Sequence, residues 1–296
     1  MPSSSPPTSV ERAKPWLGTL VSIRVEALDE RRAHDAISRA FQEVEQVHQL
    51  MSFHQPDSDL SRLNRDAVHG AVEVDGRTYQ VLTQALRAAR LSKGAFDPTV
   101  ARELVGVGVM PRPAGAAEPD PTASWRDVEL IPDGNEVRFH RPLWLDLGGI
   151  AKGYAVDLAC ERLAKEGVIQ GRVDAGGDLR VFGPRAEQVQ LRPNRFISHD
   201  APVLEIQDGA VAGSGGSSSP VDATEPSCHV DGVSREVIKS RDFVAVVAER
   251  CLSADALTKV VLASSAVAAS RVLRREGATA YHRSEAGEWT VLGTSA

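Results

Sequence analysis

Glycines and carboxylates concentrate in short segments, and these are the places where the sequence could do chemistry. The segments are residues 94–99, 145–154, 174–178 and 253–259. In residues 145–154 an apolar stretch leads through Gly148-Gly149 into the start of a helix. Backbone N–H groups at a helix start bind anions, and Lys152 would add positive charge for a phosphate. A plain tight turn gives the same pattern, so both interpretations stay open.

The carboxylates in two of the other segments also allow two interpretations each. Asp255 begins a long helix, where it either stabilises the helix dipole or binds a hard cation. Asp174 and Asp178 flank Gly176-Gly177, which indicates a strand bulge with solvated acids or an edge that faces a ligand. Residues 94–99 fit a helix end followed by a proline turn. Neither a phosphate-binding P-loop nor a dinucleotide-binding glycine fingerprint occurs, so the usual nucleotide folds are not indicated.

Strands and helices alternate irregularly along the chain, which favours an α+β fold over a doubly wound sheet. Period-two and period-3.6 patterns, with their capping residues, define these elements. Strands are expected at residues 20–25, 143–147, 173–182, 203–206, 243–247, 279–282 and 289–292, and helices at 29–51, 78–92, 150–166 and 254–276, the last broken near 264–265. Residues 111–121 and the Gly/Ser run 213–219 are expected to be loops, the latter flexible or in contact with a ligand. We expect residues 1–13 to form a disordered arm and residues 14–296 a single large domain.

Composition limits the class of protein. The chain has 296 residues, with 34 basic and 40 acidic side chains and a net charge of −6, which argues against a nucleic-acid partner. No apolar stretch approaches the roughly 20 residues that cross a bilayer. Three scattered cysteines do not indicate a disulfide framework. The Pro/Ser-rich start has no signal-peptide pattern, so we expect a cytoplasmic protein, or an exported one if its N-terminus was trimmed.

Several motifs, taken together and in order, resemble the FAD:protein FMN transferase family, the ApbE type. The motifs are residues 15–19, 51–64, 94–100, 145–157, 174–183 and 254–257. The match is almost verbatim over residues 146–157, and the resemblance covers nearly the whole chain from Lys14.

The resemblance implies a T-fold-like α+β structure with antiparallel sheets and packed helices. It also implies transfer of the FMN moiety of FAD to a Thr or Ser hydroxyl of an acceptor protein, with release of AMP and dependence on Mg²⁺. By position, the residues that would contact the flavin nucleotide are Leu17, His54, Ala95, Phe96, Asp97, Asp146 and Lys152. Gly149, Asp255 and Thr258 would hold Mg²⁺, and His229 would be the general base.

This chain departs from the family pattern near the proposed metal. Lys259 stands where the family has threonine, four residues after Asp255, and its ammonium would repel Mg²⁺ or replace its charge. Ser214-Gly215-Gly216 lacks the family's acid, residues 231–235 keep little of the family's Asp-Pro-Arg-Thr-Gly, and His54 replaces an aromatic residue. His229 could also be an ordinary surface or core histidine. The alternative function is therefore a flavin-nucleotide-binding protein without transferase activity, or an FAD pyrophosphatase.

Overall fold

A long antiparallel sheet organises the fold. The structure is a computed structural model, and it describes residues 8–27, 29–193, 201–215 and 229–293. Eight strands follow the order β1-β2-β6-β7-β10-β11-β12-β13, and every neighbouring pair is antiparallel. Their bounds are β1 Thr8–Trp16, β2 Thr19–Ala27, β6 Gln170–Ala175, β7 Asp178–Phe182, β10 Gly209–Gly215, β11 Phe243–Ala248, β12 Thr279–Arg283 and β13 Trp289–Leu292. The mixture of antiparallel sheets and helices confirms the predicted α+β class.

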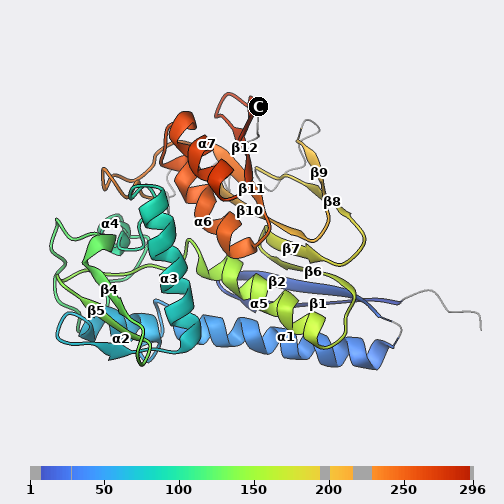
Figure 1. Cartoon of the computed structure of the whole chain (residues 1–296), viewed down its shortest axis with the longest axis horizontal. Helices are drawn as coiled ribbons and strands as arrows, with labels where there is room; N and C mark the ends of the chain where they lie inside the picture. The colour runs from blue at the N-terminus through green and yellow to red at the C-terminus, as the bar shows by residue number, and fades with distance from the viewer. Residues whose placement is uncertain (1–7, 28, 194–200, 216–228, 294–296) are drawn as a thin grey trace, which may run out of the picture.

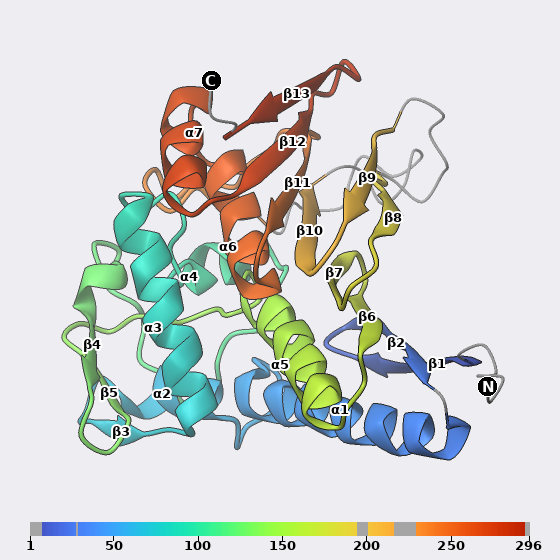
Figure 2. The same cartoon turned by 45° about the vertical axis from the view of Figure 1, so that its right-hand side comes forward.

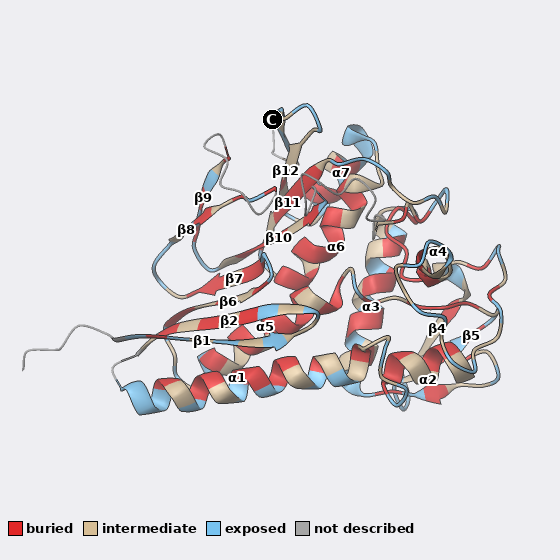
Figure 3. Ribbon diagram, turned by 180° about the vertical axis from the view of Figure 1, so that it is seen from behind, coloured by how far each residue is buried: buried red, intermediate tan, exposed pale blue. Residues whose placement is uncertain are grey.

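Three helices cover one face of this sheet and pack on one another (Figure 1). They are α1 (Glu30–Met51), α5 (Ala151–Lys165) and α6 (Cys251–Leu262), packed on β1–β2, β6–β7 and β10–β11 in that order. Helix α6 is buried along most of its length because it lies between the sheet, α5 and α3 (Gly76–Leu91) (Figure 3). None of the described helices is long and apolar enough to cross a membrane.

A second group of elements lies to one side of the sheet, next to α3 (Figure 2). It contains the three-stranded sheet β3-β5-β4 and two short helices. The bounds are β3 Val72–Glu73, β5 Glu136–Phe139, β4 Val128–Ile131, α2 Asp59–Asp66, α4 Ala101–Gly106 and the 3₁₀ turn η1 Trp125–Asp127. A separate hairpin, β8 (Glu187–Gln190) with β9 (Val203–Ile206), covers part of the long sheet's other face.

The expectation of a disordered arm over residues 1–13 is wrong for residues 8–13. They form most of β1, which pairs with β2 along its whole length. Val10 is buried in the core beneath α1, and Arg12 Nη1 donates to Ser38 Oγ at 2.7 Å. The Pro/Ser-rich composition indicated disorder, whereas the segment forms a strand whose alternate residues face α1. Residues 1–7 lie outside the described residues, and the single-domain expectation for 14–296 stays a prediction.

Residues 173–182 form a hairpin and not one strand with a bulge. Strands β6 and β7 pair with each other, and Gly176 and Gly177 make the turn with φ of 67° and 100°. Positive φ at both central positions suits the right-handed twist of a two-residue hairpin. Residues 213–215 were expected in a loop but end β10, and residues 216–219 lie outside the described residues.

Residues 143–147 are not a strand. The Leu145 backbone instead bonds to the side-chain amide of Asn64, with Leu145 N–H donating to Oδ1 at 2.7 Å and Nδ2 donating to the Leu145 carbonyl at 3.1 Å. An asparagine side chain thus replaces a strand partner. The predicted helix break is confirmed, because α7 (Ala266–Arg275) starts afresh from an N-cap at Ser265.

Candidate active site

Helices α5 and α6 approach so closely at Gly153 that no other residue fits there. A Cβ atom at this position would lie 2.3 Å from the carbonyl oxygen of Cys251. The close approach brings the Gly153 N–H to Asp255 Oδ2 at 3.2 Å. The side chain of Asp255 is completely buried, and its hydrogen bond with Gly153 points the carboxylate at the first turn of α5.

A second buried carboxylate fixes the start of α6. Asp157 of α5 accepts hydrogen bonds from the backbone N–H groups of Cys251 and Leu252, both at 3.0 Å. Arg180 Nη1 donates to the same carboxylate at 3.0 Å. The first N–H groups of a helix have no partner inside it, so Asp157 caps α6 from a neighbouring helix. This contact sets the position of Asp255 one turn further on.

Two lysines and two buried aspartates meet where α5, α6, β7 and β10 converge; we call Lys152, Asp178, Asp255 and Lys259 the lysine cluster. Lys152 forms an ion pair with Asp178, and its Nζ lies 3.9 Å from Asp255 Oδ2. Lys259 Nζ lies 2.5 Å from Asp255 Oδ1. Asp178 also accepts from the Gly213 N–H at 3.1 Å. Each carboxylate is thus shared between an ammonium and a backbone N–H, and the lysines remain partly exposed.

A chain of hydroxyl groups supports Lys259. Lys259 Nζ donates to Ser214 Oγ at 2.9 Å, and Ser214 Oγ lies 2.8 Å from Thr258 Oγ1. The Thr258 hydroxyl donates to the Asp255 carbonyl at 2.7 Å, so Ser214 must donate to Thr258 and accept from the ammonium.

The charges of the cluster shift its acid–base equilibria. Burial would raise the pKa of Asp255, but Lys152 and Lys259 hold it below its ordinary value. Burial raises the pKa of Asp178, and the nearby charge of Asp255 raises it further. Burial alone would lower the pKa of Lys152, but Asp255 and Asp178 raise it above the ordinary value. At neutral pH Lys152 is therefore an ammonium, which is the charge that an anionic ligand requires.

His229 lies close enough to this cluster for its pKa to respond to the charges there. Burial, followed by the charges of Lys259 and Lys152, lowers the pKa of His229 to about 4. The backbone holds the residue in place, because the His229 carbonyl accepts from the Ile238 N–H at 2.9 Å. A neutral imidazole beside an anion site can accept a proton, which is what the predicted general base must do.

The structure brings some of the predicted flavin-contact residues to the cluster. Phe96 Cε2 lies 3.4 Å from the point that a Cβ atom would occupy at Gly149. The Phe96 ring is buried, as is the neighbouring Ala95. Burial raises the pKa of Asp146, which is also close enough to feel the charges of Lys259 and Asp255. Asp146, Gly149, Phe96 and Lys152 therefore line one region.

Leu17 and His54 come from other parts of the chain. Leu17 lies in the turn between β1 and β2 with φ of 56°, and it packs against two of the hydrophobic core clusters. His54 follows α1 and is exposed, with its ring 6.4 Å from that of Phe53. Their contacts with a flavin stay predictions.

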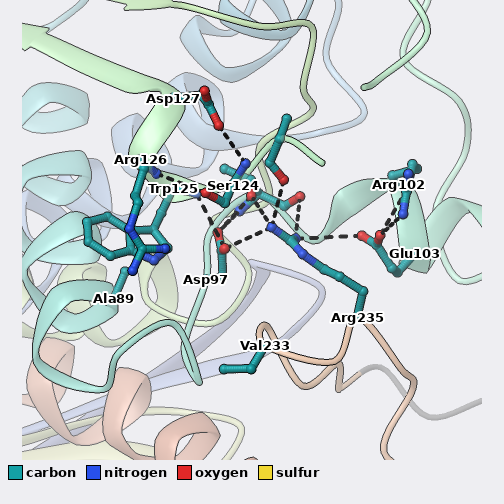
Figure 4. Close-up of polar contacts among 12 residues, drawn as sticks. Ala89, Asp97, Arg102, Glu103, Ser124, Trp125, Arg126, Asp127, Val233 and Arg235 are labelled. Carbon is teal, nitrogen blue, oxygen red and sulfur yellow. Dashed lines mark hydrogen bonds and ion pairs between the residues drawn. The ribbon is translucent and has the colours of Figure 1, made fainter. Parts of the chain in front are cut away.

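Asp97 has a structural environment of its own. Arg235 Nη2 donates to Asp97 Oδ2 at 2.9 Å, and Thr99 donates twice to Oδ1 through its N–H and hydroxyl, at 2.8 and 2.7 Å. Figure 4 shows the Arg235 guanidinium between Asp97 and Glu103. We call Asp97, Thr99, Glu103 and Arg235 the arginine cluster. Burial raises the pKa of Asp97, and Arg235 opposes this shift. With both carboxylate oxygens engaged, only the backbone of residue 97 is suited to contact a ligand.

The residues predicted to bind magnesium do not fit a divalent cation as they stand. The Cε atom of Lys259 lies 3.3 Å from the Cβ position of Gly149, so the lysine fills the space between Gly149 and Asp255. The Thr258 hydroxyl is already bonded to the Asp255 carbonyl and to Ser214. Within the described residues no group of three or more His, Cys, Asp or Glu side chains is arranged to hold a metal.

A cavity of about 560 Å³ lies on the other face of the long sheet, beneath the β8–β9 hairpin. Gly213 and Gly215 line it, whereas Ser214 between them points to Lys259, because successive strand residues face opposite ways. Asp174 also lines the cavity, but its carboxylate accepts from Arg172 at 2.5 Å and from the Gly177 N–H at 2.9 Å. The sheet therefore separates this cavity from the lysine cluster.

Sequence reasoning did not assign site roles to Asp178, Ser214 and Arg235. The Asp174–Asp178 spacing did single out a carboxylate, but only the hairpin turns Asp178 towards Lys152. Ser214 belonged to a run that indicated a loop, and the alternation of β10 gives it its direction. Nothing in the sequence connects Arg235 with Asp97, 138 residues away.

Comparisons with known proteins agree with this architecture. The model of the ApbE family matches residues 17–282. An FAD:protein FMN transferase of Vibrio cholerae is 28% identical over 271 residues, which cover 85% of this chain and 80% of the relative. That of Salmonella typhimurium is 24% identical over 306 residues, covering 97% and 87%. Some matches are shorter, such as that of Treponema pallidum, 31% identical over 58% of this chain and 51% of the relative.

Solved structures give the same fold. The ApbE protein of Thermotoga maritima superposes with a TM-score of 0.82 at 25% identity, with 96% of each chain covered. The flavin transferase ApbE of Vibrio cholerae superposes with a TM-score of 0.79 at 23% identity, with 98% of each chain covered.

Proposed function

This chain belongs to the ApbE family, and from that premise we propose that it is an FAD:protein FMN transferase. The reaction would move the FMN moiety of FAD to a Thr or Ser hydroxyl of an acceptor protein and release AMP. The relatives that carry this name align along most of the chain. The single observation that supports it most directly is the lysine cluster, because Lys152 in the first turn of α5 and Lys259 of α6 bring two ammonium groups together as a site for a pyrophosphate.

The chemistry requires little from the protein beyond position and charge. The acceptor oxygen would attack the phosphorus of the FMN half of FAD, and the P–O bond to the AMP half would break. AMP would leave with the bridging oxygen, and the hydroxyl proton would pass to His229. The products are an FMN phosphodiester on the acceptor and free AMP.

The residues near the cluster would divide this work. Lys152 would neutralise the pyrophosphate, since it is held between Asp178 and Asp255 and remains partly exposed. Phe96 and Leu17 would supply apolar contact for the flavin, and His54 would take the place of an aromatic residue over its ring. His229 would accept the proton, and the approach of the anionic pyrophosphate would raise its pKa from about 4 towards the working range.

The family resemblance implies Mg²⁺, but the arrangement of Lys259 does not fit a divalent ion next to Asp255. We therefore derive no step through a metal. The acceptor is proposed as a protein with a Thr or Ser attachment site.

The proposal is tested by incubating the purified protein with FAD and an acceptor protein that carries an attachment threonine, or alanine in its place. We expect AMP to appear together with flavin attached covalently to the threonine-bearing acceptor only. AMP with free FMN would indicate a pyrophosphatase instead. Tight FAD binding without AMP would indicate a binding protein. Either result would overturn the transferase assignment.

A further inference from the structure

Lys259 places a positive charge beside Gly149 and Asp255, two of the residues to which the family resemblance assigns a bound cation. It lies one helical turn after Asp255, so both side chains share one face of α6. Its ammonium contacts Asp255 Oδ1 at 2.5 Å and Ser214 Oγ at 2.9 Å. Its aliphatic stem lies against Gly149, with Cε and Cδ at 3.3 and 3.7 Å from the Cβ position.

The surrounding hydrogen bonds are arranged for an ammonium group. Thr258 donates to the Asp255 carbonyl, which leaves its hydroxyl oxygen to accept from Ser214. Ser214 then presents lone pairs to Lys259. An ammonium has three N–H donors, and the contacts with Asp255 and Ser214 use two of them. The Lys259 side chain is 16% exposed, so the remaining donor can turn to a phosphate oxygen at the surface.

Within the lysine cluster itself the charges are already balanced, and burial raises the pKa of the neighbouring Asp146, which favours its neutral form. The carboxylates of Asp178 and Asp255 face the ammonium groups of Lys152 and Lys259, two negative charges against two positive ones. A divalent ion at Asp255 would have to displace Lys259 from its closest carboxylate and stand beside it. Like charges at such distances repel strongly in a buried site.

We propose that the Lys259 ammonium is a built-in cation for the pyrophosphate of FAD, so that FAD binding by this protein needs no divalent metal. The inference rests on the proposed function for the identity of the ligand, but the lack of a divalent-metal site at Asp255 is a separate property of the chain. Lys152 and Lys259 would then contact the pyrophosphate from α5 and α6.

The first experiment measures metal binding alone, by the loss of the free Mn²⁺ electron paramagnetic resonance signal on titration with protein. We expect the wild-type protein to leave the signal unchanged. In Lys259→Thr a hydroxyl replaces the ammonium beside Asp255 and Gly149, and we expect one Mn²⁺ to bind. Lys239→Thr, at an exposed lysine, is the matched control and should behave as wild type. One Mn²⁺ bound by the wild-type protein, and lost in Asp255→Ala, would overturn the proposal.

The second experiment measures FAD affinity by quenching of flavin fluorescence, in EDTA or in Mg²⁺. We expect the wild-type dissociation constant to agree within about twofold between the two conditions, since its cation is covalently part of the chain. Lys259→Met, which removes the charge without adding an oxygen ligand, should bind at least about tenfold more weakly in both. Lys259→Thr should bind weakly in EDTA and recover in Mg²⁺.

The outcomes separate the two proposals. Wild-type FAD binding that vanishes in EDTA would overturn the built-in cation even if the transferase activity is real. No FAD binding in either condition would contradict the proposed function, while the Mn²⁺ titration would still decide whether Asp255 is a metal site. If Lys259→Thr fails to fold by circular dichroism, the wild-type titration and Lys259→Met carry the test.

Discussion

Buried aspartates in this protein are held in two different ways. In the arginine cluster, and at Asp157, the partner is a guanidinium that donates to the carboxylate from one nitrogen, and backbone N–H or Thr99 donors complete the set. In the lysine cluster the partners are compact ammonium groups that remain partly exposed. A guanidinium presents its donors in one plane and so fixes the geometry of the groups around it, whereas an ammonium is a point charge that can turn to a new partner. We infer that the carboxylates held by arginine build the frame and that those held by lysine form the candidate site.

The strongest test of the frame is Asp157→Ala. The change leaves two N–H groups of α6 without a partner and Arg180 without its carboxylate. We expect the free energy of unfolding to fall by about 3–5 kcal/mol, as for other broken buried pairs. Urea denaturation gives the value, with Asp133→Ala at an exposed turn as the control. A loss no larger than that of the control would contradict the role of Asp157.

Arg235 offers a sharper test because it combines an ion pair with backbone strain. Its φ is 61°, in the left-handed region that glycine tolerates best. Arg235→Ala removes the partner of buried Asp97 and keeps the strain, so we expect a loss of about 3 kcal/mol in unfolding free energy. Arg235→Gly also removes the partner of Asp97 but relieves the strain, so we expect its unfolding free energy to fall by about 1 kcal/mol less than that of Arg235→Ala. Equal unfolding free energies for the two variants would show that the strain is unimportant.

For the lysine cluster we expect a substitution to change activity more than stability, the reverse of what we expect for the arginine cluster. Lys152→Met should lower the rate of AMP release from FAD by about 100-fold, because it removes a charge that acts on the pyrophosphate. Its unfolding free energy should change less than that of Arg235→Ala, since Asp178, whose pKa is already raised, can take up a proton in place of its partner. A large loss of stability with normal AMP release would reverse the assignment of the two clusters.

The smallest effect concerns His229 and pH. The pKa of His229 is lowered to about 4 from an ordinary 6.5. At pH values between these two, this histidine is protonated in the unfolded chain but not in the folded one. Stability is therefore complete above about pH 6.5 and falls as the pH drops towards 4, by about 2 kcal/mol after allowance for partial exposure. Unfolding free energies measured from pH 7 to 4 should fall less steeply for His229→Asn. Parallel curves for the two proteins would contradict a neutral His229 beside the lysines.

Local patterns made most of the elements predictable, and long-range contacts account for the rest. The break between α6 and α7 followed from Ser264-Ser265, and the helix over Glu30–Met51 followed from its apolar spacing. Strand β1 was not predicted because the Pro/Ser-rich composition at the start of the chain was given more weight than the alternation of the residues that follow. Residues 143–147 were taken for a strand because Asn64, which replaces the strand partner, lies 81 residues away.

The site was predictable only in part, for the same reason. Lys152, Asp255 and Lys259 stand out by motif and spacing, and the structure places their side chains together. Whether Lys259 would repel a metal or replace its charge could not be decided from spacing alone. Our proposal that it replaces the charge uses the direction of Ser214, which depends on the register of β10, and the distance from Lys259 to Gly149.

The most direct test of the account is AMP release from FAD by the wild-type protein with a threonine-bearing acceptor, followed in EDTA and in Mg²⁺. We expect AMP and covalently attached flavin in both conditions, at rates within about threefold of each other. This expectation is contradicted if AMP appears only with Mg²⁺, because Lys259 would then not supply the charge, or if no AMP appears in either condition.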